Sequence, residues 1–150
     1  MKNNKLNLLL NKVMKHSLKL RKGDNILTGF HFSKDDLKFE HYEEESGITG
    51  ELCNLLAREG ATLGAGFFHW KPCQWETKLP YDEVLYFVEV DGKFEITFDD
   101  ETITISQGDV CHFTKGTVLK FNVEGTATEY YVTSDPYIGE ASPSTEGGNK

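Results

Sequence analysis

The chain has 150 residues, of which 38% are hydrophobic and 12% aromatic, and this composition is typical of one folded domain rather than a disordered chain. Its net charge of -8 and pI near 5.1 argue against nucleic acid as a partner, because phosphate binding requires clustered cations. Three widely spaced cysteines and the lack of any apolar run of membrane-span or signal-peptide length argue against a disulfide scaffold and a membrane protein, so we expect a cytoplasmic protein.

Residues 1–25 are predicted to form an N-terminal extension with a short amphipathic helix over 5–20. Its apolar positions near helical spacing are Leu6, Leu9, Leu10, Val13, Met14 and Leu18. The favoured interpretation is a helix packed on the main domain or across a dimer. The alternatives are a targeting peptide for a protein shell and a membrane-surface helix, which its lysines permit.

The next segment gives weaker signals. Residues 26–32 are consistent with an edge strand that has Phe30 and Phe32 on one face. Residues 33–46 are charged and are expected to lie on the surface. Residues 47–56 fit either a strand or a short helix, and periodicity does not separate the two.

From residue 63 onward the pattern is strongly β. Small residues lead into an aromatic strand over 64–70, and apolar and polar residues alternate over 94–98 before a turn at Asp99-Asp100. Further strands are predicted over 102–105, 110–113, 118–123 and 129–133. Short strands at regular intervals predict an all-β barrel or sandwich, which we place at 26–137 with a disordered tail over 138–150.

Two blocks of this region resemble the two motifs of the cupin family. The first is Leu-Pro-Tyr-Asp-Glu at 79–83, followed by an apolar run, and the second is Gln-Gly-Asp-Val at 107–110 with Thr-Lys-Gly at 114–116. The resemblance implies a double-stranded β-helix, or jelly-roll, barrel, here with a short N-terminal helical extension.

The cupin resemblance also implies where metal ligands would stand. The family's glutamate falls on Glu83, whereas its histidines fall on Thr77, Leu79 and Leu119 (or, with a spacing one residue longer, the first two on Glu76 and Lys78). One carboxylate does not make a transition-metal site, which needs three or four converging donors. We therefore expect no tightly bound metal.

A narrower resemblance is to the ethanolamine-utilisation EutQ family. It rests on Leu-Gly-Ala-Gly-Phe at 63–67, Trp75, 79–84, Gly-Asp-Val at 108–110 and Lys-Gly at 115–116. This chain departs from the family at Val90-Asp91, inserted between Glu89 and Gly92, and at Thr114, where the family has proline. The basic N-terminal segment has no counterpart in the family.

The EutQ resemblance implies a small homodimeric cupin associated with a bacterial microcompartment, with shell or enzyme partners. It also implies acetate kinase activity, which makes ATP from acetyl phosphate or runs in reverse. Phosphoryl transfer depends on positioning and charge neutralisation, and Asp82 and Glu83 suit a magnesium ion that arrives with a nucleotide. Lys78, Lys115 and Lys120 suit phosphate, although no GxxxxGK[ST] loop is present.

The predicted catalytic residues are Glu83, Asp82 and Tyr81, and the predicted substrate-binding residues, around a small molecule in the barrel mouth, are Trp75, Lys78, His112 and Lys115. Structural interpretations stand beside these roles. Glu83 fits a solvated or tyrosine-bonded carboxylate, Asp82 a turn-orienting residue, and Trp75 rim packing. Cys111 fits a small buried hydrophobe.

Two other functions remain open. One is a non-catalytic cupin that binds a small molecule or acts as an adaptor through its N-terminal helix. The other is a metal-independent isomerase or epimerase, in which a histidine or tyrosine carries protons together with Asp82 or Glu83.

Overall fold

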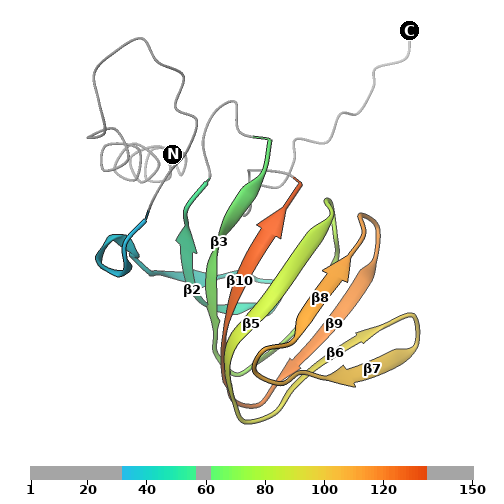
Figure 1. Ribbon diagram of the computed structural model, residues 1–150. Helices are drawn as coiled ribbons and strands as arrows, with labels where there is room; N and C mark the ends of the chain where they lie inside the picture. Colours follow the sequence, from blue (N-terminus) through green and yellow to red (C-terminus); the bar gives the residue numbers. More distant parts are fainter. Residues whose placement is uncertain (1–31, 57–61, 135–150) are drawn as a thin grey trace, which may run out of the picture.

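The computed structural model describes residues 32–56 and 62–134, and nearly all of this part is β-structure (Figure 1). A short 3-10 helix, η1 (Lys34–Asp36), precedes ten strands. The strands are β1 (Glu40–Glu43), β2 (Thr49–Asn54), β3 (Gly64–Trp70), β4 (Cys73–Lys78), β5 (Glu83–Asp91), β6 (Phe94–Phe98), β7 (Glu101–Thr104), β8 (Val110–Phe113), β9 (Val118–Val123) and β10 (Thr126–Thr133).

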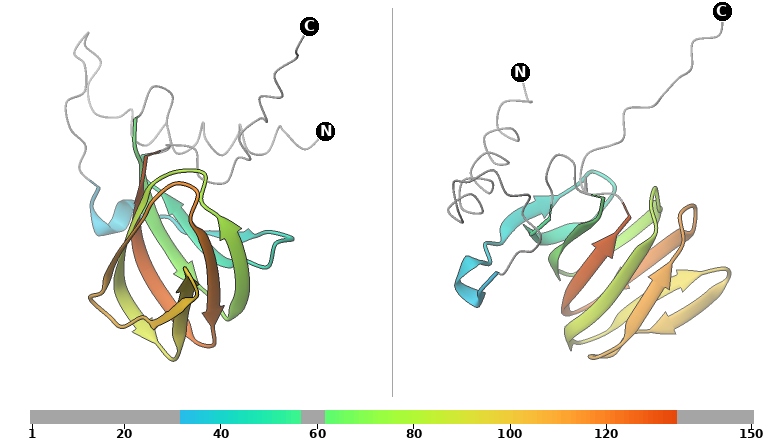
Figure 2. Two further views of the ribbon diagram at one scale, coloured as in Figure 1. Left: turned by 90° about the vertical axis from the view of Figure 1, so that its right-hand side faces the viewer. Right: turned by 45° about the horizontal axis from the view of Figure 1, so that its top comes forward.

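The strands form two antiparallel sheets that face each other (Figure 2). The larger sheet has the order β1-β2-β3-β10-β5-β8, and the smaller has the order β4-β9-β6-β7. The chain crosses from one sheet to the other between consecutive strands several times. This crossing joins the two sheets into one barrel, and its interior is the only place where the apolar faces of both can be buried together.

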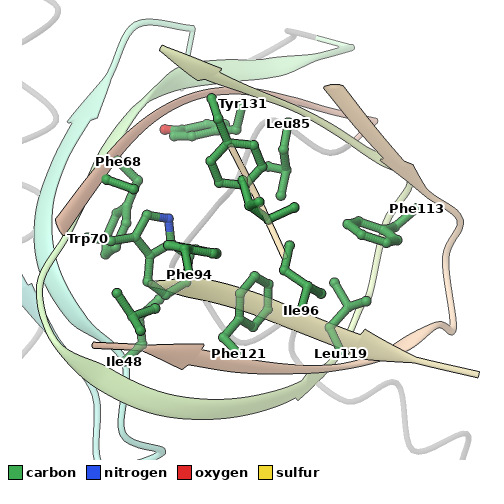
Figure 3. Close-up of a cluster of buried hydrophobic side chains, with 14 of the residues drawn as sticks. Ile48, Phe68, Trp70, Leu85, Phe94, Ile96, Phe113, Leu119, Phe121 and Tyr131 are labelled. Atoms are coloured by element: carbon green, nitrogen blue, oxygen red, sulfur yellow. The ribbon is translucent and has the colours of Figure 1, made fainter. Parts of the chain in front are cut away.

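Alternation of side chains places every second residue inside the barrel. Strand β10 shows the pattern clearly, because Ala127, Glu129, Tyr131 and Thr133 are buried and the residues between them are only partly buried. Aromatic side chains from both sheets meet in the interior, including Trp70 and Phe121, whose rings stack with centroids 4.9 Å apart (Figure 3). The core is therefore continuous from one sheet to the other.

Most strands predicted from alternation are confirmed. The strands over 64–70, 94–98, 110–113 and 118–123 have the predicted bounds, and the predicted turn at Asp99-Asp100 joins β6 to β7. Both aspartates have positive φ angles, of 48° and 63°, which suits the twist of a tight hairpin. The ambiguous segment over 47–56 contains a strand, β2, because pairing with β3 satisfies its backbone.

The structure also contains two strands that the sequence did not predict. Strand β1 lies inside the charged segment over 33–46, and none of its residues is fully buried. It is an edge strand held by pairing with β2, so its sequence needs no apolar face. Strand β4 carries Trp75 and pairs with β9 in the smaller sheet.

The helix predicted over 5–20 and the tail predicted over 138–150 lie outside the described residues, as does the predicted strand over 26–32 except Phe32, which belongs to no strand. In the described ranges, no helix is long and apolar enough to cross a membrane.

Candidate functional site at the rim of the barrel

Glu83 begins strand β5 at one end of the barrel, the upper end in Figure 1. It pairs with Thr133 at the end of β10 and with Phe113 at the end of β8, and it shares the inward face of β5 with buried Leu85 and Phe87. Burial raises the pKa of its carboxyl group to about 7. The Glu83 carboxyl group can therefore gain or lose a proton near neutral pH.

Asp82 links three segments of the same rim through hydrogen bonds. Its carboxylate Oδ1 accepts a hydrogen bond of 2.7 Å from the backbone N–H of Lys115, in the turn between β8 and β9. Its own backbone N–H donates to Ser134 Oγ at 3.0 Å, and its carbonyl oxygen accepts from the Ser134 N–H at 2.9 Å. Asp82 thus holds the rim together and fixes the backbone of exposed Lys115 in the turn between β8 and β9.

Tyr81 also lies at this rim, partly buried and packed against the core. Its ionisable hydroxyl group is one of the groups whose interaction raises the Tyr131 pKa, after the larger effect of burial. Four of the predicted site residues, namely Tyr81, Asp82, Glu83 and Lys115, therefore come together at one end of the barrel.

The other three predicted residues do not join them. Lys78 and His112 are exposed and occupy outward positions of β4 and β8, since their neighbours Leu79 and Phe113 are buried. Trp75 faces inward and stacks on Phe121 with ring centroids 5.2 Å apart. Its Nε1–H donates a hydrogen bond of 3.1 Å to Ser46 Oγ, and its partly buried ring packs against the aromatic core.

The structure adds one inward carboxyl group that the sequence analysis missed. Glu129, on β10, is only 4% exposed, and its Oε2 has no hydrogen-bond partner among the described residues. Burial raises its pKa well above the usual value, and the charge of Glu83 raises it further. The signal that could have identified it is the alternation of β10, which puts a glutamate in phase with Ala127 and Tyr131.

Trp70 lies next to Glu129 in the interior. Its indole N–H acts to lower the Glu129 pKa, although Trp70 Nε1 makes no hydrogen bond of normal geometry with any described residue. The indole is 2% exposed, so its donor is shielded from water. Figure 3 shows its nitrogen directed into the interior rather than toward the strands.

The side chain of Tyr131 extends away from Glu129 and across strand β3. Its hydroxyl donates a hydrogen bond to Asn54 Oδ1 on β2, and its pKa is raised, mainly by burial. The ring passes over Gly66, where any side chain would collide with it. On the opposite side, Cys111 on β8 has its pKa raised to about 11, mainly by burial, and so remains a neutral thiol.

The positions where cupins carry metal-binding histidines are part of the apolar interior. Thr77 pairs with Leu119, and Leu79 and Leu119 are 3% and 0% exposed. Within residues 32–56 and 62–134, no group of three or more histidines, cysteines, aspartates or glutamates is arranged to hold a metal ion. What the site offers is two coupled inward carboxyl groups, an indole N–H and a lysine at the rim.

Comparison with known proteins identifies a family and a fold. The family described as "Ethanolamine utilisation protein EutQ" matches residues 33–136. A curated relative, "Acetate kinase EutQ" of Clostridioides difficile (strain 630), is 32% identical over 75 residues, which cover 50% of this chain and 46% of the relative. The chain spans about half the length of the curated relatives that it matches.

Solved structures agree with this family and with this fold. The Clostridium difficile EutQ protein is 29% identical, with a TM-score of 0.50 over 57% of this chain and 68% of that one. An RmlC-like cupin from Shewanella frigidimarina NCIMB 400 is 15% identical, with a TM-score of 0.54 over 74% of this chain and 95% of that one. The second likeness shows the fold alone, and the predicted cupin barrel is confirmed.

Proposed function

The chain belongs to the EutQ family of ethanolamine-utilisation proteins, and we propose that it carries out acetate kinase-type phosphoryl transfer at the rim of its barrel. The name of the Clostridioides difficile relative, "Acetate kinase EutQ", supports this reaction. The observation that carries the proposal is the rim itself, where the hydrogen bond from the Lys115 backbone N–H to Asp82 Oδ1, 2.7 Å long, ties the turn that carries Lys115 to the residue before Glu83.

The reaction needs no net proton transfer. An acetate oxygen bonds to the γ-phosphorus of ATP as the bond from that phosphorus to the β,γ-bridging oxygen breaks, which gives acetyl phosphate and ADP. Catalysis of such a step is mainly positioning and neutralisation of charge, with magnesium supplied on the nucleotide. The site must therefore offer positive charge to phosphate and a hydrogen-bond donor to acetate.

The rim meets these two needs with Lys115 and Glu83. Of the three predicted phosphate-binding lysines, Lys115 has its backbone at this rim, whereas Lys78 and Lys120 lie on the outward face of the smaller sheet. Glu83, with a pKa of about 7, is partly protonated at neutral pH and can donate a hydrogen bond to the acetate carboxylate. Asp82, which is exposed, can accept hydrogen bonds from water bound to magnesium.

The test is ATP formation by the purified full-length chain from acetyl phosphate and MgADP. We expect Lys115→Ala and Glu83→Gln each to lower kcat/KM by about tenfold to a hundredfold, the usual cost of losing a charged or hydrogen-bonding contact. Lys93→Ala, in the turn between β5 and β6, is the matched control and should leave the rate unchanged. Turnover no higher than the blank with the folded protein would overturn the proposal.

Metal-independent proton transfer is the second candidate, and the Glu83 carboxyl group favours it. A general base works best when its pKa lies near the working pH, which the pKa of about 7 satisfies. Incubation of the protein with sugars and keto acids in deuterium oxide would then place deuterium next to a carbonyl group, and Glu83→Gln would abolish it. Absence of exchange across the panel would rule this candidate out.

Homodimerisation and association with a microcompartment also remain proposals. Light scattering after gel filtration tests the dimer, and a monomer at micromolar concentration would contradict it. The adaptor role depends on residues 1–22, which lie outside the described residues. It predicts that deleting them abolishes recruitment of partners while the melting temperature of the barrel stays nearly the same, and recruitment that survives the deletion would contradict it.

A further inference from the structure

We propose that Glu83 and Glu129 together bind a small organic ammonium ion inside the barrel. This site goes beyond the rim chemistry and does not depend on phosphoryl transfer. It rests on the placement of two inward carboxyl groups on neighbouring strands, β5 and β10, and on the absence of any described cationic side chain that faces them.

The first argument is the missing counter-charge. Glu129 is 4% exposed and its Oε2 has no hydrogen-bond partner among the described residues. A buried carboxylate without a cation costs several kcal/mol on the order-of-magnitude scale, so such groups are normally paired. The described lysines and histidines all occupy exposed or outward positions, and the described ranges contain no arginine. No described side chain therefore neutralises the pair in its charged form, and we infer that a cationic ligand does so.

The second argument is the indole N–H of Trp70, which makes no hydrogen bond of normal geometry with a described residue. A ligand that lies next to Trp70 and Glu129 must accept a hydrogen bond from Trp70 Nε1 and also donate one to a carboxylate. A hydroxyl group does both, and an ammonium group supplies the positive charge and three donors. A short amino alcohol carries both groups on one small frame, which makes it the ligand class that the site fits best.

The third argument is the aromatic wall around Glu129. By register, Glu129 lies between Phe68 on β3 and Phe87 on β5, and both rings are buried. Aromatic faces attract organic cations, by about 0.5–2 kcal/mol for each contact. An anion, by contrast, would meet two carboxyl groups and no inward cation from residues 32–56 and 62–134. A metal ion would lack donors, since the described residues hold no metal-binding group.

Tyr131 lies between the two glutamates along the inner face of β10. The glutamates are not opposite each other, because Glu83 pairs with Thr133 and Glu129 lies four residues away from Thr133 along β10. The Tyr131 ring lies over Gly66 on β3, and its hydroxyl group is hydrogen-bonded to Asn54 on β2. The ring is thus held on the β3 side of β10, away from Glu83 on β5.

Binding should strengthen as pH rises from 6 to 8, because the ligand requires charged carboxylates. Burial raises the pKa values of both glutamates, and so they hold protons when no cation is present. The other groups around them are Tyr131 on β10, Cys111 on β8 and Tyr81 before β5. The raised pKa values of Tyr131 and Cys111 keep these two neutral across that range.

The experiment is isothermal titration of the full chain with ethanolamine, the compound in the family's description, at pH 6 and pH 8. Ethylammonium tests the charge alone and ethylene glycol the hydroxyl alone. We expect ethanolamine to bind more tightly than ethylammonium, and ethylene glycol not to bind. Glu129→Gln should weaken ethanolamine binding by about tenfold or more, since one charge-assisted contact is lost.

Glu89→Gln, an exposed position on the outward side of β5, is the matched control and should bind as the unmodified protein does. If Glu129→Gln does not fold, carbon NMR of the glutamate carboxyl groups in the unmodified protein replaces it, with a ligand-dependent shift at two carboxyl signals expected. The proposal is overturned if ethanolamine does not bind at millimolar concentration, if Glu129→Gln binds it equally well, or if no carboxyl signal moves. Ethanolamine binding without ATP formation would overturn only the phosphoryl transfer, and ATP formation without ethanolamine binding only this site.

Discussion

The ring of Tyr131 lies directly over Gly66, and no other residue at position 66 would leave it there. A Cβ atom on Gly66 would clash with both the Tyr131 side chain and the backbone carbonyl oxygen of Cys53, because it would lie closer to them than van der Waals contact allows. Because Tyr131 reaches Asn54 by crossing this glycine, the absence of a side chain at 66 fixes where the tyrosine goes. The small-residue entry into β3 is therefore a packing requirement of the interior.

Gly66→Ala should destabilise the barrel by about 1–3 kcal/mol, the usual range for overpacking in a filled core. The measurement is urea unfolding followed by tryptophan fluorescence. Tyr131→Phe separates the two effects, since it keeps the ring and removes the hydrogen bond, and it should cost about 1 kcal/mol. A Gly66→Ala protein as stable as the parent would show that Tyr131 does not occupy this position.

Asp82→Ala should loosen the rim. It removes the acceptor of the 2.7 Å hydrogen bond from the Lys115 backbone, so we expect a loss of about 1–3 kcal/mol in unfolding free energy. Hydrogen exchange at the Lys115 amide should increase at the same time. Asp91→Ala, at an exposed position at the end of β5, is the control and should change stability by less than about 0.5 kcal/mol. Unchanged protection of the Lys115 amide would contradict the role of Asp82.

Trp75→Ala should destabilise the protein by about 3–5 kcal/mol, because it empties part of the aromatic core. Trp75 stacks on Phe121 and also contacts Trp70, with ring centroids 5.9 Å apart. Trp75→Phe keeps an aromatic ring and loses only the hydrogen bond to Ser46 Oγ, so it should retain most of the stability. Equal losses for the two variants in thermal unfolding would mean that the stacking contributes little.

The sequence predicted the hairpins well because local signals agree there. Alternation over 94–98 and the Asp99-Asp100 turn both specify the hairpin of β6 and β7, and no distant contact is needed to place them. Strand β1 gave no such signal, since an exposed edge strand can be polar on both faces. The cupin resemblance supplied the barrel architecture, which local patterns do not contain.

The site was predicted only in part, because the sequence did not show which residues of some strands face the interior. Val110 is 65% exposed, so an apolar residue marks the outward side of β8 and makes its inward side hard to identify. His112 was predicted as a site residue because an imidazole suits proton transfer near neutral pH, but it shares the outward phase of Val110. Glu129 was missed because its nearness to Glu83 depends on the pairing of β10 with β5, which join residues far apart in the chain.

Glu83→Gln should stabilise the protein at alkaline pH and leave it unchanged at acidic pH. Burial raises the Glu83 pKa from 4.5 to about 7 in the folded state, so the folded protein binds more protons than the unfolded chain between these values. Stability therefore falls as pH rises from about 4.5 to about 7 and is constant with respect to this group above that. Glutamine resembles the protonated acid and has no charge to bury.

The difference in unfolding free energy between Glu83→Gln and the parent should be close to zero at pH 4 and about 1–3 kcal/mol in favour of the variant at pH 8. Urea unfolding at both pH values, each more than half a unit from the sequence pI of about 5.1, gives this difference. Glu129→Gln should show the same sign, because its pKa is raised in the same direction by burial and by Glu83. Glu89→Gln, exposed on the same strand, should show no pH-dependent difference. If Glu83→Gln is instead less stable at pH 8, the carboxylate has a cationic partner in the folded protein, and its desolvation is not the dominant effect.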